Sequence, residues 1–543
     1  MSGIAPPGVR SRAVNRWTVL VVLCVSLLVV AVDATVLHVA VPAVSEDLRP
    51  SGVELLWIVD AYPLVCASLL ILFGTLGDRV GRRRVLLIGY GCFALASAAA
   101  AYASGAGVLI AARALLGVGG AMIMPATLSI LRQVFPDRRE RALAIGVWSA
   151  VAAVGAALGP LVGGVLLEHF WWGSVFLVNL PLMAVCLPAA RALLPESTGD
   201  RTGPWDVTGA LMAAAGLFSV ILAVKRAGGG DLFTAGTVLA AGGGALLLVL
   251  FARRQRRLPE PLVDLAAFAR PAFGTAVGCI VLTVLALVGL ALVAAQYLQL
   301  VLGLSPLETG LRLLPLSVAA IAAGLAGSRL LDALGPRRMV AAGFVLTAVA
   351  VLVLISLDDH DRPLLMVTGF VLLGFGLETT LFASYESMLN DVPVRQAGGA
   401  AAIGETAYQF GAGLGIAVLG SIMNAVYGPA VQRFKGVSPT DSAAAGHSLG
   451  EAYTVASDVG GGTGEALRQA AREAFVHGMK VTLVVSAVLL LAGAVAARRL
   501  PRGLQGPALH GADRAGESAC PGAAGDRSVA ARAAGPVPPR GDS

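Results

Sequence analysis

Apolar runs long enough to cross a lipid bilayer recur along almost the whole of this 543-residue chain. A helix needs about 20 apolar residues to cross the ~30 Å hydrocarbon core of a membrane. By this measure the sequence contains about fourteen spans, at 17–42, 53–74, 85–104, 107–131, 142–167, 173–194, 206–224, 232–251, 272–302, 310–331, 338–357, 363–389, 399–423 and 475–497. The first run is too long for a signal peptide and further spans follow it, so we expect it to remain in the protein. We therefore predict an all-α polytopic membrane protein.

The composition agrees with this prediction. Hydrophobic residues make up 57% of the chain and charged residues 13%, and the mean hydropathy is +0.79. A soluble globular chain carries about 25% charged residues. The bilayer is therefore the expected solvent for most of the chain.

The net charge of +7 reflects how arginine is distributed among the loops. Arg-rich loops alternate with loops that carry mainly acidic residues, and the Arg-rich ones lie at 79–84, 132–141, 253–257, 337–338 and 498–502. The positive-inside rule puts Arg-rich loops in the cytoplasm. We therefore expect a cytoplasmic-membrane protein with a cytoplasmic N-terminus (1–16), a disordered cytoplasmic tail (498–543) and no nucleic-acid partner.

Residues 424–474 interrupt the pattern of apolar runs because they are rich in Gly, Ser, Ala and Thr. This composition predicts a long external loop. A short amphipathic helix is expected within it, near residues 465–475.

Motifs of enzymes, metal sites and nucleotide-binding proteins are absent from the sequence. The six cysteines show no metal-ligand or redox spacing. The sequence has no nucleophile elbow and no GxxxxGKS/T phosphate-binding loop. We therefore expect no enzymatic activity, no metal, no cofactor and no disulfide, and an energy source other than ATP.

Three pairs of similar segments recur at nearly the same separation. GDRVGRRRV at 77–85 resembles LDALGPRRM at 331–339, and VGAALGPLVGG from Val154 resembles FGAGLGIAVLG from Phe410. LLGVGG at 115–120 likewise resembles LLGFGL at 372–377. Such repeats predict two related six-helix bundles, 17–194 and 272–497, with two inserted helices within 195–271.

Four stretches carry a resemblance to a known family: LLVVAVDATVLHVAVPAVSEDL from Leu27, GTLGDRVGRRR from Gly74, LIAARALLGVGGAMIMPA from Leu109 and GAALGPLVGGVL from Gly155. They resemble the fourteen-helix drug:proton antiporter branch of the major facilitator superfamily. LLWIVDAYPLV from Leu55 is similar to the second helix of exporters of quaternary ammonium compounds in that branch. The resemblance implies a monomer in the bilayer that exports lipophilic cationic compounds in exchange for protons.

Ionisable side chains within spans are costly, so each is a candidate functional residue. At 1.5 Å per residue, Asp33 lies roughly 13 Å, and Asp60 and Arg113 roughly 10 Å, below the external ends of their helices. The resemblance implies proton coupling by Asp33 and Arg113 and substrate binding by Asp60 and Trp57. The alternatives are a permanent structural ion pair between Asp33 and Arg113, solvation of Asp60 near the mouth, and an outward-directed Arg113.

The second bundle contributes three further carboxylates within its spans. The resemblance implies proton coupling and substrate binding by Glu405, and Glu378 is a second candidate for substrate binding. Glu386 lies near the cytoplasmic end and is the weakest candidate. Gly404 and Gln409 occupy positions where some relatives carry further acids, which weakens the expectation that this side recognises divalent cations.

Carboxylates suit proton-coupled export for a physical reason. Burial in an apolar site favours the neutral form of a carboxyl group, so such a group can carry a proton near neutral pH. A cationic substrate that needs the same carboxylate excludes the proton. Competition for one group then yields antiport.

Two glycine-rich stretches are expected to serve the helix packing and the conformational change that transport requires. Gly155, Gly159 and Gly163 recur every fourth residue, which allows close helix packing, and with Pro160 and Gly164 they match the family's antiporter motif. The stretch FGTLGDRVGRRRV matches a conformational latch formed by Gly74, Gly77, Asp78, Arg79, Gly81, Arg82 and Arg83. We expect Asp78 to face an opposing helix N-terminus or an arginine, and the arginines at 79–84 to form ion pairs between the bundles.

Three other functions stay open at this stage. A proton-coupled uptake carrier would lack the antiporter motif of 155–164 and would carry polar or basic residues in place of Asp33 and Asp60. A dedicated exporter of an endogenous antibiotic, conferring self-resistance, is not distinguished from a multidrug exporter by sequence. A membrane receptor or scaffold leaves the intramembrane acids and the repeats unexplained.

Overall fold

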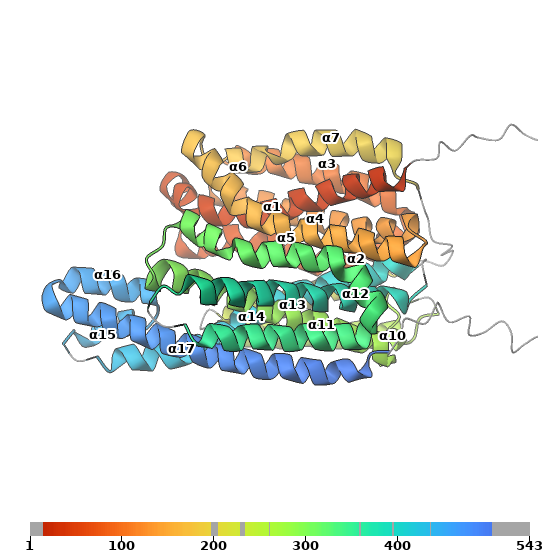
Figure 1. Ribbon diagram of the computed structural model, residues 1–543. Coiled ribbons are helices and arrows are strands. Elements are labelled where there is room, and N and C mark those ends of the chain that lie inside the picture. Colours follow the sequence, from red (N-terminus) through yellow and green to blue (C-terminus); the bar gives the residue numbers. More distant parts are fainter. Residues whose placement is uncertain are drawn as a thin grey trace, which may run out of the picture. The chain divides into compact units, whose positions relative to one another are not determined.

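The computed structural model describes residues 15–196, 205–228, 234–259, 261–357, 360–393, 396–434 and 436–501. Helices dominate these ranges, as the apolar runs predict (Figure 1). The principal ones are α1 (Arg16–Leu48), α2 (Gly52–Val80), α3 (Arg82–Ala101), α4 (Ala106–Val134), α5 (Arg138–His169), α6 (Ser174–Leu177), α7 (Asn179–Leu193), α8 (Val207–Gly228), α9 (Ala235–Gln255), α10 (Ala266–Ala269), α11 (Pro271–Gln296), α12 (Pro306–Ile355), α13 (Pro363–Asn390), α14 (Ala397–Gln432), α15 (Pro439–Ala445), α16 (Leu449–Val459) and α17 (Gly461–Ala496). The N-terminal residues 1–14 and most of the predicted tail lie outside the described residues.

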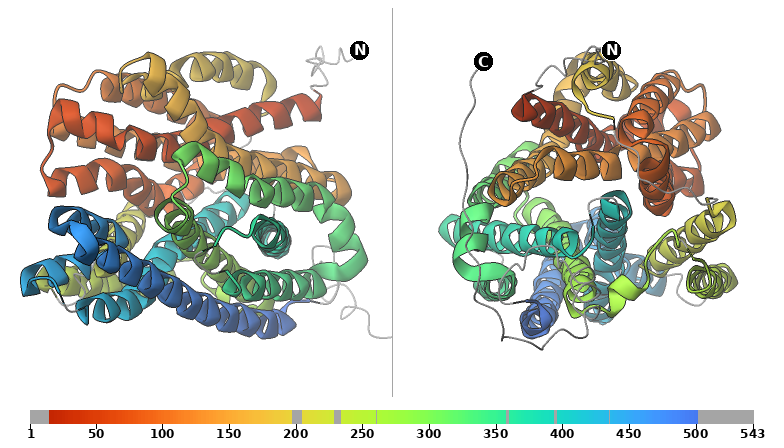
Figure 2. Two further views of the ribbon diagram at one scale, coloured as in Figure 1. Left: turned by 60° about the vertical axis from the view of Figure 1, so that its left-hand side comes forward. Right: turned by 90° about the vertical axis from the view of Figure 1, so that its right-hand side faces the viewer.

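The helices pack as two groups with a pair between them in sequence. In the first bundle, α1 packs against α5, and α4 packs against α2 and α3. In the second bundle, α12 packs against α13 and α17, and α11 packs against α14. The right-hand view of Figure 2 shows the red and orange helices on one side and the green to blue helices on the other.

Several helix contacts join these groups. Helix α14 packs against α2 and α4, and α5 packs against α12 and α13. The inserted helix α8 packs against its partner α9 and also against both α2 and α14. The inserted pair therefore lies at the seam between the two bundles.

Twelve helical segments of the described chain are long and apolar enough to cross a membrane. One of them, Glu308–Ile355, has 48 residues and covers two predicted spans, 310–331 and 338–357. A kink at Gly335, whose φ of 71° lies in the region that favours glycine, separates its two halves. Helix α5 covers the predicted span 142–167 and is not among the twelve. The all-α polytopic fold is confirmed, whereas the total of fourteen crossings stays a prediction.

The segment predicted as a long external loop is largely helical. Helix α14 continues to Gln432, α15 and α16 follow, and α17 begins at Gly461, well before the predicted span at 475. The segment 424–474 thus contains more helix than the single short one predicted near 465–475, and its place outside the membrane stays a prediction. Serine side chains start both short helices, because Ser438 accepts a hydrogen bond from the backbone N–H of Asp441 and Ser448 one from that of Glu451.

The glycines of the fifth predicted span lie against α1. A Cβ atom at Gly155 would lie 2.6 Å from the Cβ of Ala31, one at Gly159 would lie 3.0 Å from the Cβ of Thr35, and one at Gly163 would lie 3.0 Å from the Cγ2 of Val36. Gly164 has no heavy atom within 4 Å of such a position. The side chain of Pro160 lies outside the described residues. Three glycines thus allow α1 and α5 to approach closely, and the fourth faces open space.

This difference predicts unequal effects of valine at two nearby positions of α5. Gly159→Val forces a branched side chain into Thr35 on α1, and overpacking of this kind costs about 1–3 kcal/mol. Gly164→Val is the matched control because its new side chain meets open space. Thermal unfolding of the detergent-purified variants should show a lower melting temperature for Gly159→Val alone. Equal melting temperatures would contradict the packing argument.

Candidate functional site

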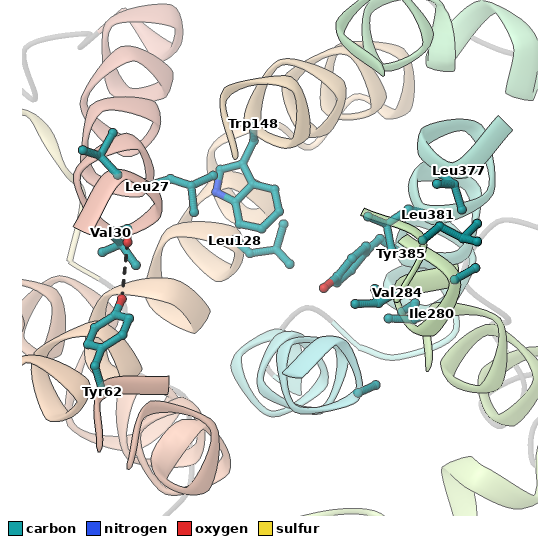
Figure 3. Packing of buried hydrophobic residues seen from close by; sticks show 14 of the residues in the cluster. Leu27, Val30, Tyr62, Leu128, Trp148, Ile280, Val284, Leu377, Leu381 and Tyr385 are labelled. Carbon is teal, nitrogen blue, oxygen red and sulfur yellow. Dashed lines mark hydrogen bonds between the residues drawn. The ribbon is translucent and has the colours of Figure 1, made fainter. Parts of the chain in front are cut away.

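A cavity of about 1390 Å³ lies between the two bundles. Its lining combines residues of α1, α2, α4 and α5 with residues of α8 and of the second bundle, and most of these side chains are aliphatic or aromatic. Trp148 of α5 and Tyr385 of α13 face each other across the seam, with ring centroids 6.4 Å apart in an edge-to-face arrangement (Figure 3). A cavity of this volume and lining suits a lipophilic small molecule.

The cavity extends toward one end of the bundles. Its lining includes Glu168, which lies in the last turn of α5, and Ser305, which caps the start of α12. We call this end the Glu168 end. At the opposite end, which we call the Asp78 end, α2 ends close to the start of α14. Direct contacts between the bundles close the Asp78 end, as described below.

Charged groups are few in this lining, and four of the five are acidic. They are Asp60, Glu168, Glu378, Glu405 and Lys225. Asp60 of α2 accepts a hydrogen bond from the ammonium of Lys225 on α8, and the pair forms a salt bridge. Its two side chains are partly exposed, 33% for Asp60 and 22% for Lys225. The predicted cation-binding carboxylate therefore already has an internal cation as its partner.

The two glutamates of the second bundle lie deeper and are buried. Glu405 of α14 accepts a hydrogen bond from the hydroxyl of Tyr385 at 3.0 Å. Glu378 of α13 is 7% exposed, and its Oε1 is buried without a hydrogen-bond partner among the described residues. A buried carboxylate oxygen without a donor is costly unless the group is protonated or binds a ligand. These two acids are therefore suited to hold a proton or to face a cation.

Asp33 and Arg113 lie behind the cavity wall. Their Oδ2 and Nη1 atoms are 3.0 Å apart and both side chains are almost fully buried, at 0% and 1% exposure. Asn179 of α7 donates a hydrogen bond of 2.8 Å to the other carboxylate oxygen of Asp33. The described lining of the cavity includes Asp60 but neither Asp33 nor Arg113, so Asp60 and the Asp33–Arg113 pair are separate groups in this conformation.

Tyr62 separates this pair from the cavity. Its ring lines the cavity and lies under the guanidinium of Arg113, 4.8 Å from the ring centroid. Its hydroxyl donates a hydrogen bond to the carbonyl of Val30 at 3.3 Å (Figure 3). Tyr62 therefore connects the Asp33–Arg113 pair to the cavity wall, although neither member of the pair is in the described lining.

Trp57 lies outside the described lining as well. It packs against a small apolar cluster formed by Leu64 and Ala67 of α2 and Ile221 of α8. In this conformation Trp57 therefore contributes to the contact between α2 and the inserted helix α8.

Asp78 joins the two bundles at the Asp78 end. Its carboxylate accepts hydrogen bonds from the backbone N–H groups of Gly398 at 3.1 Å and Gly399 at 2.9 Å, which lie in the first turn of α14. Arg82 donates to the same carboxylate at 2.9 Å. Gly74 makes this approach possible, since a Cβ atom there would lie 2.7 Å from the carbonyl oxygen of Gly398.

Within the part of the chain that the structure describes, the ion pairs of Arg83 and Arg84 lie in the first bundle and not, as had been expected, between the bundles. Arg83 and Arg84 face Glu196 near the end of the first bundle, with nitrogen–oxygen distances of 3.3 and 3.7 Å. Arg79 lies in the last turn of α2. Gly81 has a φ of 120°, which favours glycine, and a Cβ atom at Gly77 would meet its nearest atom only at 3.9 Å.

Arginines at the start of α5 supply these ion pairs instead. Arg139 lies 3.3 Å from Asp332, the counterpart of Asp78 in the second bundle. Arg141 lies 3.5 Å from the buried Glu386 and donates a hydrogen bond of 2.8 Å to Asn390. Glu386 thus belongs to the closure of the Asp78 end and lies outside the described lining of the cavity, although it follows Glu378 by eight residues on α13. The reason for the correction is tertiary: α5, not the α2–α3 connection, faces α12 and α13.

Sequence reasoning missed several residues that the fold brings into or beside the cavity. Lys225 carried a usable signal, because it is one of only three lysines in the chain and lies in an apolar run. Tyr62 follows Asp60 by two residues in a stretch already singled out. Asn179, Trp148 and Tyr385 are ordinary residues of apolar helices, and only their contacts mark them.

The same arrangement is found in known proteins. The model of the Major Facilitator Superfamily matches residues 23–416 of this chain. The chain belongs to this family. It is therefore a multi-pass membrane transporter, in agreement with the two-bundle packing and the twelve apolar helical segments.

Similar proteins of this family include bacterial resistance proteins. The chain is 40% identical over 488 residues to the multidrug efflux pump LfrA of Mycolicibacterium smegmatis, which covers 90% of this chain and 97% of LfrA. It is 39% identical to the methyl viologen resistance protein SmvA of Salmonella typhimurium, over 88% of this chain and 97% of SmvA. The crystal structure of the human organic anion transporter MFSD10 matches with a TM-score of 0.58 at 15% identity, over 88% of this chain and 99% of that chain. This last likeness shows the fold alone.

Proposed function

We propose that this protein exports lipophilic cationic compounds across the cytoplasmic membrane in exchange for protons, and so confers resistance to several drugs. The observation that carries the proposal is the apolar cavity with the carboxylates of Asp60, Glu378 and Glu405 in its wall. An apolar wall binds the body of a lipophilic molecule, and the carboxylates favour a positive charge. The resistance proteins to which the chain is similar support the same function.

Proton coupling follows from the chemistry of the deep acids. Glu405 and Glu378 are buried in an apolar wall, and a carboxyl group in such surroundings is more easily kept neutral than one in water. A proton and a cationic substrate neutralise the same carboxylate, so they exclude each other. Loading of the proton from the acidic side therefore favours release of the cation on that side.

The contacts at the Asp78 end support an outward-open state of the cycle. We assign the Arg-rich loops, and with them both termini and the Asp78 end, to the cytoplasm by the positive-inside rule. The cavity then extends toward the outside, and the contacts of Asp78, Arg139 and Arg141 close the cytoplasmic side. Breaking these contacts is the step that opens the cavity to the cytoplasm. We expect a monomer to perform the whole cycle, since the cavity lies within one chain.

Uptake of a fluorescent lipophilic cation into everted membrane vesicles under an imposed pH gradient tests the function, because the cytoplasmic face of such vesicles points outward and export fills their lumen. We expect transport by the wild-type protein to stop when the gradient is dissipated. Glu405→Gln should lower gradient-driven transport by roughly tenfold or more, because glutamine keeps the hydrogen bond from Tyr385 but carries no exchangeable proton. Glu168→Gln, which changes an exposed acid at the rim of the same cavity, is the matched control.

Two results would contradict the proposal. Transport that continues unchanged without a pH gradient would exclude proton coupling. Normal gradient-driven transport by Glu405→Gln at wild-type expression would exclude Glu405 from the coupling step. A panel of neutral and anionic antibiotics beside cationic dyes then separates multidrug export from dedicated export of one compound.

A further inference from the structure

The inserted helix α8 brings a positive charge into the wall of the cavity. Lys225 lies in the last turn of α8, and its ammonium donates to Oδ1 of Asp60 on α2. Both residues line the cavity. They are 165 positions apart in sequence, so only the packing of α8 against α2 brings them together.

Helix α8 holds Lys225 at the seam between the bundles. Ile221, one turn before Lys225, is buried with Leu64 and Ala67 of α2. Phe410 of α14 packs against the same cluster. The position of the ammonium is therefore defined by contacts with both bundles.

The carboxylates of the cavity are consequently not equivalent. Asp60 is paired with a cation of the protein itself. Glu405 accepts a hydrogen bond from a neutral hydroxyl, and Glu378 has an oxygen without a partner. A cationic ligand that binds at Asp60 must first displace Lys225, whereas a ligand at Glu378 or Glu405 displaces no cation of the described wall.

We propose that Lys225 is an internal competitor for the cation site at Asp60 and thereby sets which cations bind and how readily they leave. This inference rests on the proposed function, since it assumes that the cavity binds cations. A small hydrated cation that takes the place of the Lys225 ammonium at Asp60 gains no interaction that the ammonium did not already make. A lipophilic cation gains the burial of its apolar body in the cavity as well, so it wins the exchange.

Lysine suits this role better than arginine. Its ammonium is a compact point charge on a flexible stem, so it can leave the carboxylate and return. An arginine holds a carboxylate through two parallel N–H···O bonds and gives it up less readily. Return of Lys225 to Asp60 after each cycle also removes the bound cation from this carboxylate.

Binding of tetraphenylphosphonium to the full-length protein in detergent, measured by titration calorimetry, tests the inference. Lys225→Met should bind this cation about fivefold more tightly than the wild type, the factor expected for loss of a partly exposed ion pair. Lys225→Arg should bind it more weakly than the wild type. Neither variant should change the affinity for triphenylphosphine oxide, a neutral compound of similar shape.

Arg226→Met is the matched control. It removes one positive charge from the same turn of α8, but Arg226 is exposed and outside the described lining of the cavity. Its affinity for tetraphenylphosphonium should equal that of the wild type. Unchanged binding of the neutral compound also shows that the Lys225 variants are folded.

The outcomes separate this inference from the proposed function. If Lys225→Met binds the cation no more tightly than the wild type, or if lysine and arginine compete equally, Lys225 is not a competitor and the inference is wrong. If the competition is seen but wild-type vesicles show no gradient-driven efflux, the inference stands and the transport mechanism fails. If the wild type binds the neutral compound but not the cation, both are wrong.

Discussion

Replacing Asp78 by asparagine should reduce gradient-driven efflux to roughly a tenth of the wild-type rate or less, since a charge-assisted contact that closes one state is lost. The Asp78 carboxylate, 2% exposed, accepts from two backbone N–H groups of α14 and from Arg82. The N-terminus of a helix carries unpaired N–H donors and a partial positive charge, so an anion is favoured there. Asparagine removes the negative charge. It also replaces one carboxylate oxygen by an amide NH2 group, whose N–H donors would then face the N–H donors of α14 or of Arg82.

The second copy of the motif offers a matched control for this variant. Asp332 aligns with Asp78, but it contacts the side chain of Arg139, which is 84% exposed. Exposed ion pairs contribute little, so Asp332→Asn should leave efflux within about twofold of the wild type. Uptake of a fluorescent cation into everted vesicles, normalised to the amount of each protein, measures export by both variants. Undiminished turnover in Asp78→Asn would show that the Asp78 contact has no role in the transport cycle. Equal losses in both variants would contradict the argument that the buried contact of Asp78 matters more than the exposed contact of Asp332.

The fold could be predicted in large part because apolar length is a local property. Each long helix of the bundles follows a run that the sequence marks by composition, and the repeats indicate which helices correspond. Helices α15 and α16 were missed because their residues are small and polar and their helical signals are brief. The signal was present at Ser448, which is followed three positions later by Glu451, a pattern typical of a helix start.

The candidate site was only half predictable, for a different reason. The intramembrane acids are visible in the sequence because charge in an apolar run is costly. Their partners are visible only in part: the sequence suggested an Asp33–Arg113 pair and a helix N-terminus or an arginine for Asp78, but which helix meets Asp78 or Asp60 depends on tertiary packing. Asp78 and Gly398 are 320 positions apart. The sequence therefore indicated the carboxylates but not that Asp60 is paired with Lys225, nor that Asp33 lies behind the cavity wall.

The burial of Asp33 leads to the second large effect. Asp33→Asn should lower gradient-driven efflux by roughly tenfold or more, because asparagine cannot take up or release a proton. Binding of tetraphenylphosphonium should stay close to that of the wild type, since Asp33 is outside the described lining of the cavity. The variant should also fold, because its amide oxygen can still accept from Arg113, whose Nη1 lies 3.0 Å from the carboxylate. Exchange of labelled cation across vesicles without a pH gradient is then expected to persist.

Removal of the other partner should act on stability instead. Arg113→Met leaves the Asp33 carboxylate buried at 0% exposure without its cation. Breaking a buried ion pair from one side costs about 3–5 kcal/mol, because an uncompensated charge remains in an apolar environment. Asn179 still donates one hydrogen bond to Asp33, which offsets only part of this cost. Asp33→Asn likewise leaves the Arg113 guanidinium buried without its anion, but the guanidinium keeps the carbonyl of Ile58 and the ring of Tyr62 as partners, so its loss should be smaller. Thermal unfolding in detergent should therefore show a large loss for Arg113→Met, a smaller one for Asp33→Asn, and recovery of much of the loss in the double variant. A double variant whose loss equals the sum of the two single losses would contradict a charged pair, and gradient-driven efflux by Asp33→Asn at the wild-type rate would exclude Asp33 from proton coupling.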